Sequence, residues 1–237
     1  MSEGLKIRYK QVLEEIESAA RSAGRDPEQI KLVVVTKGHS FSEIDALYQL
    51  GGREIGENRV GEALEKQTVL EALEGLRWHM IGHIQSRKAG EVAGNFALVH
   101  SLDSVKLAKR LDRYAQEAGV VQEVLLQFNV SGEESKSGWE AWDEPAWEGL
   151  RPEIEAVLAC EHLRVRGLMA MAPYSENPED ARPSFARLKR LQVWLAERFP
   201  EADWSELSMG MSGDFVPAIE EGATILRIGT AVMGPRI

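Results

Sequence analysis

Lys37 is the first residue of the sequence whose type and position could do chemistry. It ends the apolar run that starts at Ile30, and alternation along this run leaves both faces apolar, which is typical of a parallel strand covered on two sides. Ligands of α/β folds bind at the carboxyl ends of such strands, and a partly desolvated lysine there can form a Schiff base with a carbonyl compound. The alternative, which position alone favours, is a lysine whose amine reaches solvent along its aliphatic stem.

Two turns near the other end of the sequence could bind an anion. They share small side chains, hydroxyl groups and glycines, and their candidate residues are Ser208, Gly210, Met211 and Ser212 in one turn and Gly229 and Thr230 in the other. Glycines let backbone N–H groups come close to an anion, and each hydroxyl adds a donor. Two ordinary turns without a ligand explain the same residue types equally well.

Arg227 is a third candidate, because it interrupts the apolar run of residues 223–228. Alternation places it on the face of Ile225 and opposite Leu226. One of these two faces points into the sheet if the sheet closes, and a guanidinium buried there needs a partner. A bound ligand is one such partner, and a carboxylate such as Glu57 is the alternative.

Eight apolar segments separated by helical patterns would position these residues. We expect strands at residues 30–37, 54–57, 78–81, 97–100, 123–130, 163–170, 206–209 and 223–228. Residues 5–23 precede the first strand and have the apolar spacing of an amphipathic helix. Ser40 with Glu43 predicts a capping box for the helix after the first strand, and Asp103 predicts the start of a later helix.

This order of elements predicts an α/β fold, a single (β/α)8 TIM barrel with an additional N-terminal helix. Neither a shift in composition nor a linker rich in Gly, Pro or Ser divides residues 1–237, so we expect one domain. An open doubly wound sheet is the alternative, but no GxGxxG turn follows the first strand. In a closed barrel the last strand lies beside the first, which brings Arg227 and both turns close to Lys37.

Composition and charge exclude several classes of protein. The chain has 237 residues, and its 28 Lys and Arg against 38 Asp and Glu give a net charge of −10, which argues against nucleic acid as the main partner. No apolar run approaches the roughly 18 residues of a membrane span, and the N-terminal segment is too charged for a signal peptide. A single cysteine, Cys160, excludes an internal disulfide and is typical of the cytoplasm.

The three candidate groups together suggest one cofactor. A lysine, an anion site and an inward arginine at one mouth of a barrel match the aldehyde, phosphate and ring nitrogen of pyridoxal phosphate. Eight stretches that run nearly end to end then carry a family resemblance: VVVTK, GENRVGEALEK, WHMIGHIQSRK, HSLDS, NVSGEESKSG, RGLMAM, LSMGMSGDF and LRIGTAVMG. With them the chain resembles the pyridoxal phosphate homeostasis protein family, also called the YggS or PROSC family, which is related in fold to the N-terminal barrel of alanine racemase.

The resemblance implies a role for each candidate. Lys37 would form the Schiff base with pyridoxal phosphate, the SMGMS and GT turns would hold the phosphate, and Arg227 would face the pyridine nitrogen. Asn58 and His83, which lie in two of the matching stretches, are added as cofactor contacts. The implied function is intracellular homeostasis and supply of the cofactor without established catalytic turnover. Apoenzymes that depend on pyridoxal phosphate are the protein partners this role suggests, and we expect a cytoplasmic monomer.

Some positions depart from the family pattern. Thr36 precedes the lysine where serine is common, Gly38 and His39 replace a nearby Lys-Pro, and Gly213 replaces the first of two aspartates often found after GMS. None of these changes removes a proposed ligand. Lys136 in the loop SGEESKSG is expected to be solvated, although the resemblance also suggests a part in handing on the cofactor.

Two histidines, three tryptophans and the segment after Thr230 lead to three further expectations. His79 and His83 lack the helical spacing of a metal pair, so we expect no metal site. Three tryptophans in residues 139–147 are expected to form a packed helix face rather than a partner site. The alternative function is a small single-domain racemase or decarboxylase, but only seven residues follow Thr230, which leaves no room for the second domain of an alanine racemase.

Overall fold

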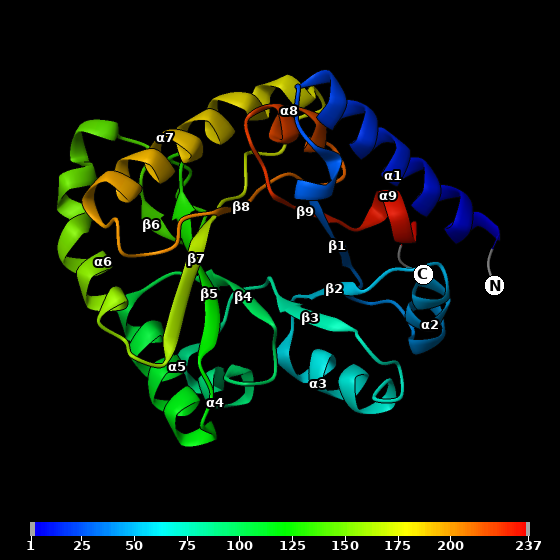
Figure 1. Ribbon diagram of the computed structural model, residues 1–237, viewed down its shortest axis with the longest axis horizontal. Coiled ribbons are helices and arrows are strands. Elements are labelled where there is room, and N and C mark those ends of the chain that lie inside the picture. Colours follow the sequence, from blue (N-terminus) through cyan, green and yellow to red (C-terminus); the bar gives the residue numbers. More distant parts are fainter. Residues whose placement is uncertain (1–2, 236–237) are drawn as a thin grey trace.

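Eight parallel strands close into a barrel, as predicted from the eight apolar segments. The structure, a computed structural model, describes residues 3–235. The barrel strands follow the order β4, β3, β2, β1, β9, β8, β7, β5, and β5 pairs back with β4 to close the ring (Figure 1). Their bounds are β1 (Lys31–Val35), β2 (Glu54–Glu57), β3 (Arg77–Met80), β4 (Leu98–Leu102), β5 (Gln122–Asn129), β7 (Leu163–Met169), β8 (Glu206–Ser208) and β9 (Ile225–Ile228).

Helices form the outer layer around the barrel (Figure 1). Their bounds are α1 (Glu3–Ser22), α2 (Phe41–Gln49), α3 (Val60–Val69), α4 (Ala89–Val92), α5 (Val105–Ala118), α6 (Arg151–Leu158), α7 (Arg182–Arg198), α8 (Phe215–Glu220) and α9 (Thr230–Met233). The predicted additional N-terminal helix is α1, which precedes the barrel and packs beside α8 and α9. Within residues 3–235, none of these helices combines the length and the apolar character needed to cross a bilayer.

Local capping explains where two of the helices begin. The predicted capping box of α2 is confirmed, since Ser40 and Glu43 each accept from the other's backbone N–H. The prediction for α5 is wrong by one residue. Ser104 is the N-cap and accepts from the Leu107 N–H at 3.3 Å, while the carboxylate of Asp103 pairs with a histidine instead.

The barrel interior and the layer between barrel and helices have different cores. A small apolar group fills the interior and consists of Val33, Leu98, Leu125, Met169 and Ile225. Leu226 and Ile228 belong to the larger core under the helices. Because residues alternate along a strand, Arg227 shares the inward face with Ile225. The sequence left open whether the side chain of Arg227 points into the barrel, and the structure shows that it does.

A ninth strand, β6 (Trp139–Glu140), was not predicted. It pairs in parallel with the end of β5, where Gly138 approaches β5 so closely that a Cβ would lie 2.5 Å from the carbonyl oxygen of Gln127. The expectation of one packed helix face for the tryptophans is wrong in part. Trp139 and Trp147 are buried as expected, but Trp139 lies in β6 and Trp142 is half exposed.

Candidate functional site

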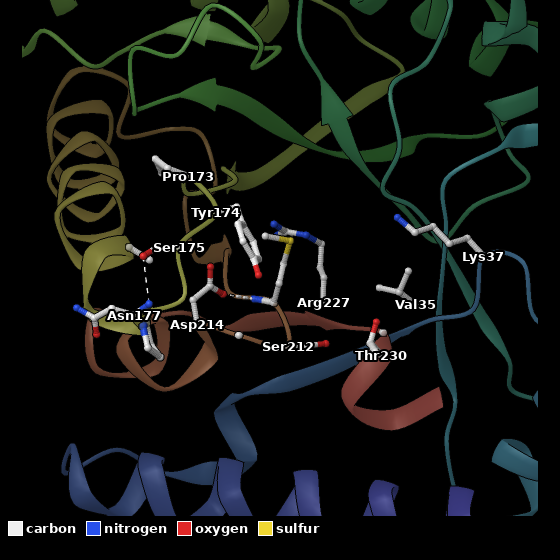
Figure 2. Close-up of a pocket in the computed structure, with 15 residues that line it drawn as sticks. Val35, Lys37, Pro173, Tyr174, Ser175, Asn177, Ser212, Asp214, Arg227 and Thr230 are labelled. Carbon is white, nitrogen blue, oxygen red and sulfur yellow. Dashed lines mark hydrogen bonds between the residues drawn. The ribbon is translucent and has the colours of Figure 1, made fainter. Parts of the chain in front are cut away.

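A cavity of about 290 Å³ opens at the carboxyl ends of β1, β8 and β9 (Figure 2). Six of the ten predicted site residues line it: Lys37, Met211, Ser212, Arg227, Gly229 and Thr230. They come from opposite ends of the sequence and meet because β9 pairs with β1. Closure of the barrel thus brings the lysine, the arginine and the two turns to one cavity.

Lys37 lies two residues beyond the end of β1, in a turn that runs on to Gly38 at φ +74°. Its side chain is partly exposed and extends toward the side of the cavity where Arg227 lies (Figure 2). The position is the one expected from the sequence. It places a primary amine where a ligand's carbonyl carbon can reach it.

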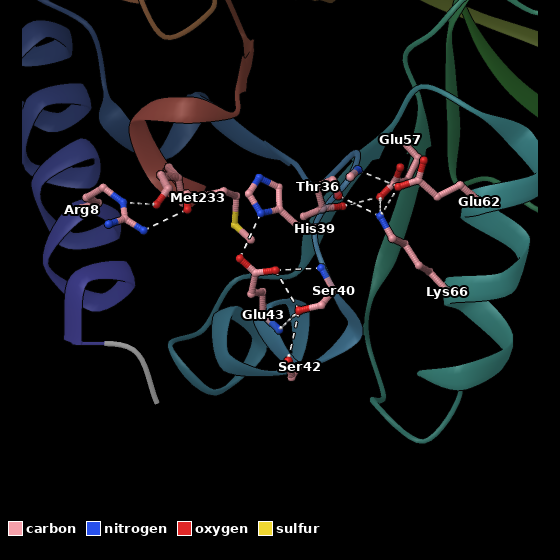
Figure 3. Close-up of polar contacts among 12 residues, drawn as sticks. Arg8, Thr36, His39, Ser40, Ser42, Glu43, Glu57, Glu62, Lys66 and Met233 are labelled. Carbon is pink, nitrogen blue, oxygen red and sulfur yellow. Dashed lines mark hydrogen bonds and ion pairs between the residues drawn. The ribbon is translucent and has the colours of Figure 1, made fainter. Parts of the chain in front are cut away.

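Four residues hold the backbone of this turn through hydrogen bonds (Figure 3). We call them the Lys66 cluster, and they are Thr36, Glu57, Glu62 and Lys66. The Nζ of Lys66 donates to the Thr36 carbonyl at 2.8 Å and to the carboxylates of Glu57 and Glu62 at 2.7 Å each. Glu62 also accepts from the Gly38 N–H at 2.7 Å. The residues on both sides of Lys37 are therefore fixed through their backbones.

The cluster shifts its two carboxylates in opposite directions. Burial raises the pKa of Glu57 even though Lys66 and Thr36 donate to it. Burial also acts to raise the pKa of Glu62, but hydrogen bonds from Lys66 and Gly38 outweigh it and the net pKa is lowered. Glu57 is thus committed to Lys66, and the interpretation that it pairs with Arg227 is wrong.

Arg227 is a buried cation held by neutral oxygens. It is 4% exposed, and its guanidinium donates to Ser208 Oγ at 2.5 Å and to the Ala170 carbonyl at 2.9 Å. Burial lowers its pKa to about 10, partly offset by Asp214 across the cavity, so it stays charged at neutral pH. Among residues 3–235 its hydrogen bonds go to no carboxylate, which leaves its charge available to a ligand.

The two predicted anion turns contact each other. Ser212 Oγ accepts from the Ala231 N–H at 3.3 Å, which joins the turn after β8 to the start of α9. The Met211 N–H donates to Asp214 at 2.5 Å. Gly210 adopts φ +91°, and a Cβ there would lie 2.7 Å from the Cβ of Ala218, so this turn requires glycine.

The second turn is also held from outside the barrel. Arg8 of α1 donates to the carbonyls of Val232 and Met233 at 2.9 Å each, as Figure 3 shows for Met233. These carbonyls lie at the end of α9, whose first residue is Thr230. The additional N-terminal helix therefore positions the turn that carries Thr230, a residue predicted to bind the phosphate.

Four predicted site residues do not line the cavity. Ser208 is fully buried below it and binds Arg227, and Gly210 shapes the turn from beneath. His83 is mostly exposed and pairs with Asp103 at 3.0 Å. Asn58 directly follows β2, and its buried Oδ1 has no hydrogen-bond partner among the described residues. Direct contact of these four with a cofactor stays a prediction.

One wall of the cavity was missed by the sequence analysis. It is the loop after β7, which contributes Pro173, Tyr174, Ser175 and Asn177. Tyr174 is 90% exposed and stands at the rim. The signal available in the sequence was positional, since any loop at the carboxyl end of a barrel strand belongs to the site face.

The fold is that of a known class of barrel. The family model described as alanine racemase, N-terminal domain, matches residues 7–236. An alanine racemase from Clostridium difficile 630 superposes with a TM-score of 0.72 at 16% identity, over 98% of this chain and 56% of that chain. That likeness concerns the fold alone.

Closer relatives define the family within this class. A pyridoxal phosphate homeostasis protein from Aquifex aeolicus is 42% identical, with 97% of both chains covered, and one from Pseudomonas aeruginosa is also 42% identical, over 93% of this chain and 91% of that protein. The structure of PipY from Synechococcus elongatus with pyridoxal phosphate bound is 36% identical, with a TM-score of 0.80 over 94% of this chain and 100% of that chain. The chain belongs to the pyridoxal phosphate homeostasis protein family.

Proposed function

We propose that the protein binds pyridoxal phosphate in this cavity through a Schiff base to Lys37 and serves the intracellular supply of the cofactor. The observation that carries the proposal is the meeting of Lys37, the two joined turns and the buried cation Arg227 around one cavity of about 290 Å³. The relatives' names and the pyridoxal phosphate bound to PipY support it. A cytoplasmic location and a monomeric state are part of the proposal.

The residues present match the three functional parts of the cofactor. Lys37 supplies the amine for the aldehyde, and Ser212, Thr230 and the backbone of their turns supply donors for the phosphate. Arg227 supplies N–H donors for the ring nitrogen. When bound, the cofactor provides an electron sink for carbanion chemistry on amines.

Arg227 is also the reason to prefer a binder over a racemase or decarboxylase. A guanidinium with a pKa of about 10 that donates to the ring nitrogen favours the unprotonated pyridine, which weakens the electron sink. Racemisation further needs a positioned base on each face of the substrate. Besides Lys37, the cavity wall offers Asp214, which is engaged by the Met211 N–H, and the exposed Tyr174.

The central test is the Lys37→Ala variant. It is expected to lose the visible absorption band that pyridoxal phosphate gives with the wild type, while circular dichroism stays unchanged. Borohydride reduction followed by peptide mapping should label Lys37 in the wild type. Lys136→Ala is the control, because Lys136 donates to the Ala172 carbonyl at 3.2 Å and lies outside the cavity wall. A band that survives in Lys37→Ala and vanishes in Lys136→Ala would contradict the assignment.

A second test separates the phosphate from the rest of the ligand. The double variant Ser212→Ala/Thr230→Val removes two hydroxyl donors for the anion, together with the oxygen that accepts from the Ala231 N–H, and each donor to a charged group contributes about 1.5 to 3 kcal/mol. Its affinity for pyridoxal phosphate should therefore fall at least tenfold, with little change for pyridoxal. Equal loss for both ligands would contradict the anion turns.

The enzyme alternative is tested by deuterium exchange at Cα of several amino acids. We expect the wild type loaded with pyridoxal phosphate to stay close to the rate of the free cofactor. Rapid and saturable exchange that disappears in Lys37→Ala would identify an enzyme instead of a carrier.

A further inference from the structure

A continuous chain of hydrogen bonds runs through the barrel interior, from Arg227 at the cavity to Glu54. We call Arg227, Ser208, His100, His79 and Glu54 the interior chain. Arg227 donates to Ser208 Oγ at 2.5 Å, and Ser208 Oγ lies 2.8 Å from His100 Nδ1. His100 Nε2 lies 2.9 Å from His79 Nδ1, and His79 Nε2 lies 2.5 Å from Glu54 Oε2. The members come from β9, β8, β4, β3 and β2.

Both ring nitrogens of each histidine have a hydrogen-bond partner in this chain, and both histidines are 0% exposed. An ionised carboxylate only accepts, so His79 donates through Nε2 to Glu54 and accepts at Nδ1 when neutral. His100 must then donate through Nε2 and accept at Nδ1 from the Ser208 hydroxyl. Ser208 in turn accepts from Arg227, so every donor points from the cavity toward Glu54.

The charges around the chain are consistent with two neutral histidines. Burial lowers the pKa of His79, opposed by Glu54, and burial together with His79 and Arg227 lowers the pKa of His100 well below its ordinary value. Lys31 on β1 acts on both histidines in the same direction, as Arg77 on β3 does on His79. Asp214 faces the Arg227 end of the chain.

Glu54 stays ionised at the opposite end of the barrel. Burial acts to raise its pKa, but the hydrogen bond from His79 and the charges of Arg77 and Lys31 lower it on balance. Its side chain is 19% exposed, and the Nε of Arg77 lies 3.3 Å from it. The chain therefore has a cation at the cavity, an anion at the far end and three neutral links between them.

We infer that Ser208, His100, His79 and Glu54 are positioning residues for Arg227, and that together they hold its guanidinium in one orientation toward the ring nitrogen of the cofactor. The inference rests on the proposed function for the identity of the ligand, but not for the chain itself. A guanidinium bound only by the Ala170 carbonyl would be free to rotate, whereas the Ser208 hydroxyl fixes a second N–H. Because Ser208 has one hydrogen, which His100 accepts, its oxygen can only accept from Arg227.

The first test uses the apoprotein and needs no cofactor. Imidazole 15N resonances of His79 and His100, assigned with His79→Gln and His100→Gln, report tautomer and charge. Both histidines are expected in the neutral Nε2–H form and should remain so at about pH 6, below the ordinary pKa of about 6.5. A charged ring or an Nδ1–H tautomer at either position would overturn the directed chain.

The second test measures the effect on the cofactor site. Ser208→Ala removes the link to Arg227 and should weaken pyridoxal phosphate about tenfold, the size of one hydrogen bond to a charged group. In ring-labelled cofactor, the pyridine 15N resonance should also move toward that of the free ligand. Glu54→Gln keeps an acceptor for His79 and removes the charge, so a smaller change of about two- to threefold is expected.

Glu206→Gln is the matched control for Glu54→Gln. Glu206 lies at the same end of the barrel, is 21% exposed in its side chain and pairs with Lys31 at 3.7 Å, but among the described residues its side chain makes no hydrogen bond or ion pair with the interior chain. It can act on the histidines only through the charge of Lys31, so it should change the affinity and the pyridine resonance less than Glu54→Gln does. Equal effects of Ser208→Ala, Glu54→Gln and Glu206→Gln, or no effect of any of them, would overturn the inference.

These outcomes are distinct from a failure of the proposed function. If pyridoxal phosphate does not react with Lys37, the proposed function fails while the histidine resonances still decide whether the chain exists. If the cofactor reacts with Lys37 but Ser208→Ala leaves its affinity and ring resonance unchanged, the proposed function stands and the positioning role is wrong.

Discussion

The interior chain and the Lys66 cluster are two buried polar groups that hold cations in opposite ways. Lys66 is surrounded by the carboxylates of Glu57 and Glu62, so its charge is neutralised where it lies. Arg227 is held by a hydroxyl and a carbonyl, and the nearest carboxylate of its chain, Glu54, is three links away. Lys66 therefore holds backbone in place, whereas the charge of Arg227 is not neutralised by a hydrogen-bonded carboxylate of the described residues and can act on a ligand.

This difference has an energetic consequence. Removing one member of a buried ion cluster leaves an opposite charge without compensation, which is costly. Removing one neutral link of a hydrogen-bond chain costs only the hydrogen bond and the desolvation of the group left behind. Stability should therefore depend on the Lys66 cluster, and ligand orientation on the interior chain.

The largest expected effect is that of Lys66→Met. Glu57, which is 0% exposed, would keep its buried carboxylate without the ammonium group, and breaking a buried pair this way costs about 3 to 5 kcal/mol. Urea unfolding measures the free energy. The double variant Lys66→Met/Glu57→Gln should recover part of the loss, because the stranded charge is gone.

Lys10→Met is the control for that variant, since Lys10 is 77% exposed and pairs with Glu14 on the same helix. It should change the free energy of unfolding by less than about 0.5 kcal/mol. A cost for Lys66→Met as small as that of the control would mean that the Lys66 cluster is not what stabilises this side of the cavity.

The next effect concerns pH and the neutral histidines of the interior chain. The folded-state pKa of His79 and of His100 lies below the ordinary 6.5, so the unfolded chain takes up protons first as the pH falls. The stability they contribute is complete above about pH 6.5 and is lost as the pH falls below it, by up to about 1.4 kcal/mol per pH unit for each histidine.

The measurement is urea unfolding at several pH values between about 8 and 5, in wild type and in His79→Gln/His100→Gln. The double variant should show a flatter pH dependence in this range. The raised pKa of Glu57 acts in the other direction, since its contribution is present below the unfolded pKa of 4.5 and is lost as the pH rises through the folded value. Glu57 is present in both proteins, so its contribution cancels when the unfolding free energies of wild type and double variant are subtracted. Identical slopes of unfolding free energy against pH in the two proteins would contradict neutral histidines.

The smallest effect is expected for Glu62→Gln. Glu62 is partly exposed, so losing its ion pair with Lys66 and weakening its bond to the Gly38 N–H should cost about 1 kcal/mol. Hydrogen exchange at the Gly38 amide should become faster. Glu65→Gln is the control, because Glu65 is an exposed residue of the same helix. If the Gly38 amide exchanged equally fast in Glu65→Gln, the result would argue against a role of the Lys66 cluster at Lys37.

Sequence was sufficient for features that depend on neighbouring residues. Apolar runs separated by helical patterns predicted all eight barrel strands, and Lys37 was placed correctly because a strand end is a local signal. Local competition explains one error, since Ser104 and Asp103 are adjacent and both are good N-caps. The strand β6 was missed because two residues carry no periodicity.

The interior chain could not be predicted in the same way. His79 and His100 were both placed on expected strands, but their contact depends on which residues of neighbouring strands share a layer. That depends on the register around the closed barrel, and the pairing of β4 with β5 shifts register between Val99 and Leu102. Ser208 reaches His100 across 108 positions in the sequence, so no local pattern joins them.

The contact of Arg8 with α9 has a consequence for how the molecule would respond to its ligand. Arg8 joins α1 to the segment that starts with Thr230, so detachment of α1 removes support from a turn that we propose binds phosphate. Linkage is reciprocal. If docked α1 strengthens ligand binding by a given free energy, bound ligand stabilises the docked state of α1 by the same free energy. Slower amide exchange along residues 5–20 in the presence of the ligand would record that thermodynamic coupling, in a helix that contributes no residue to the cavity wall.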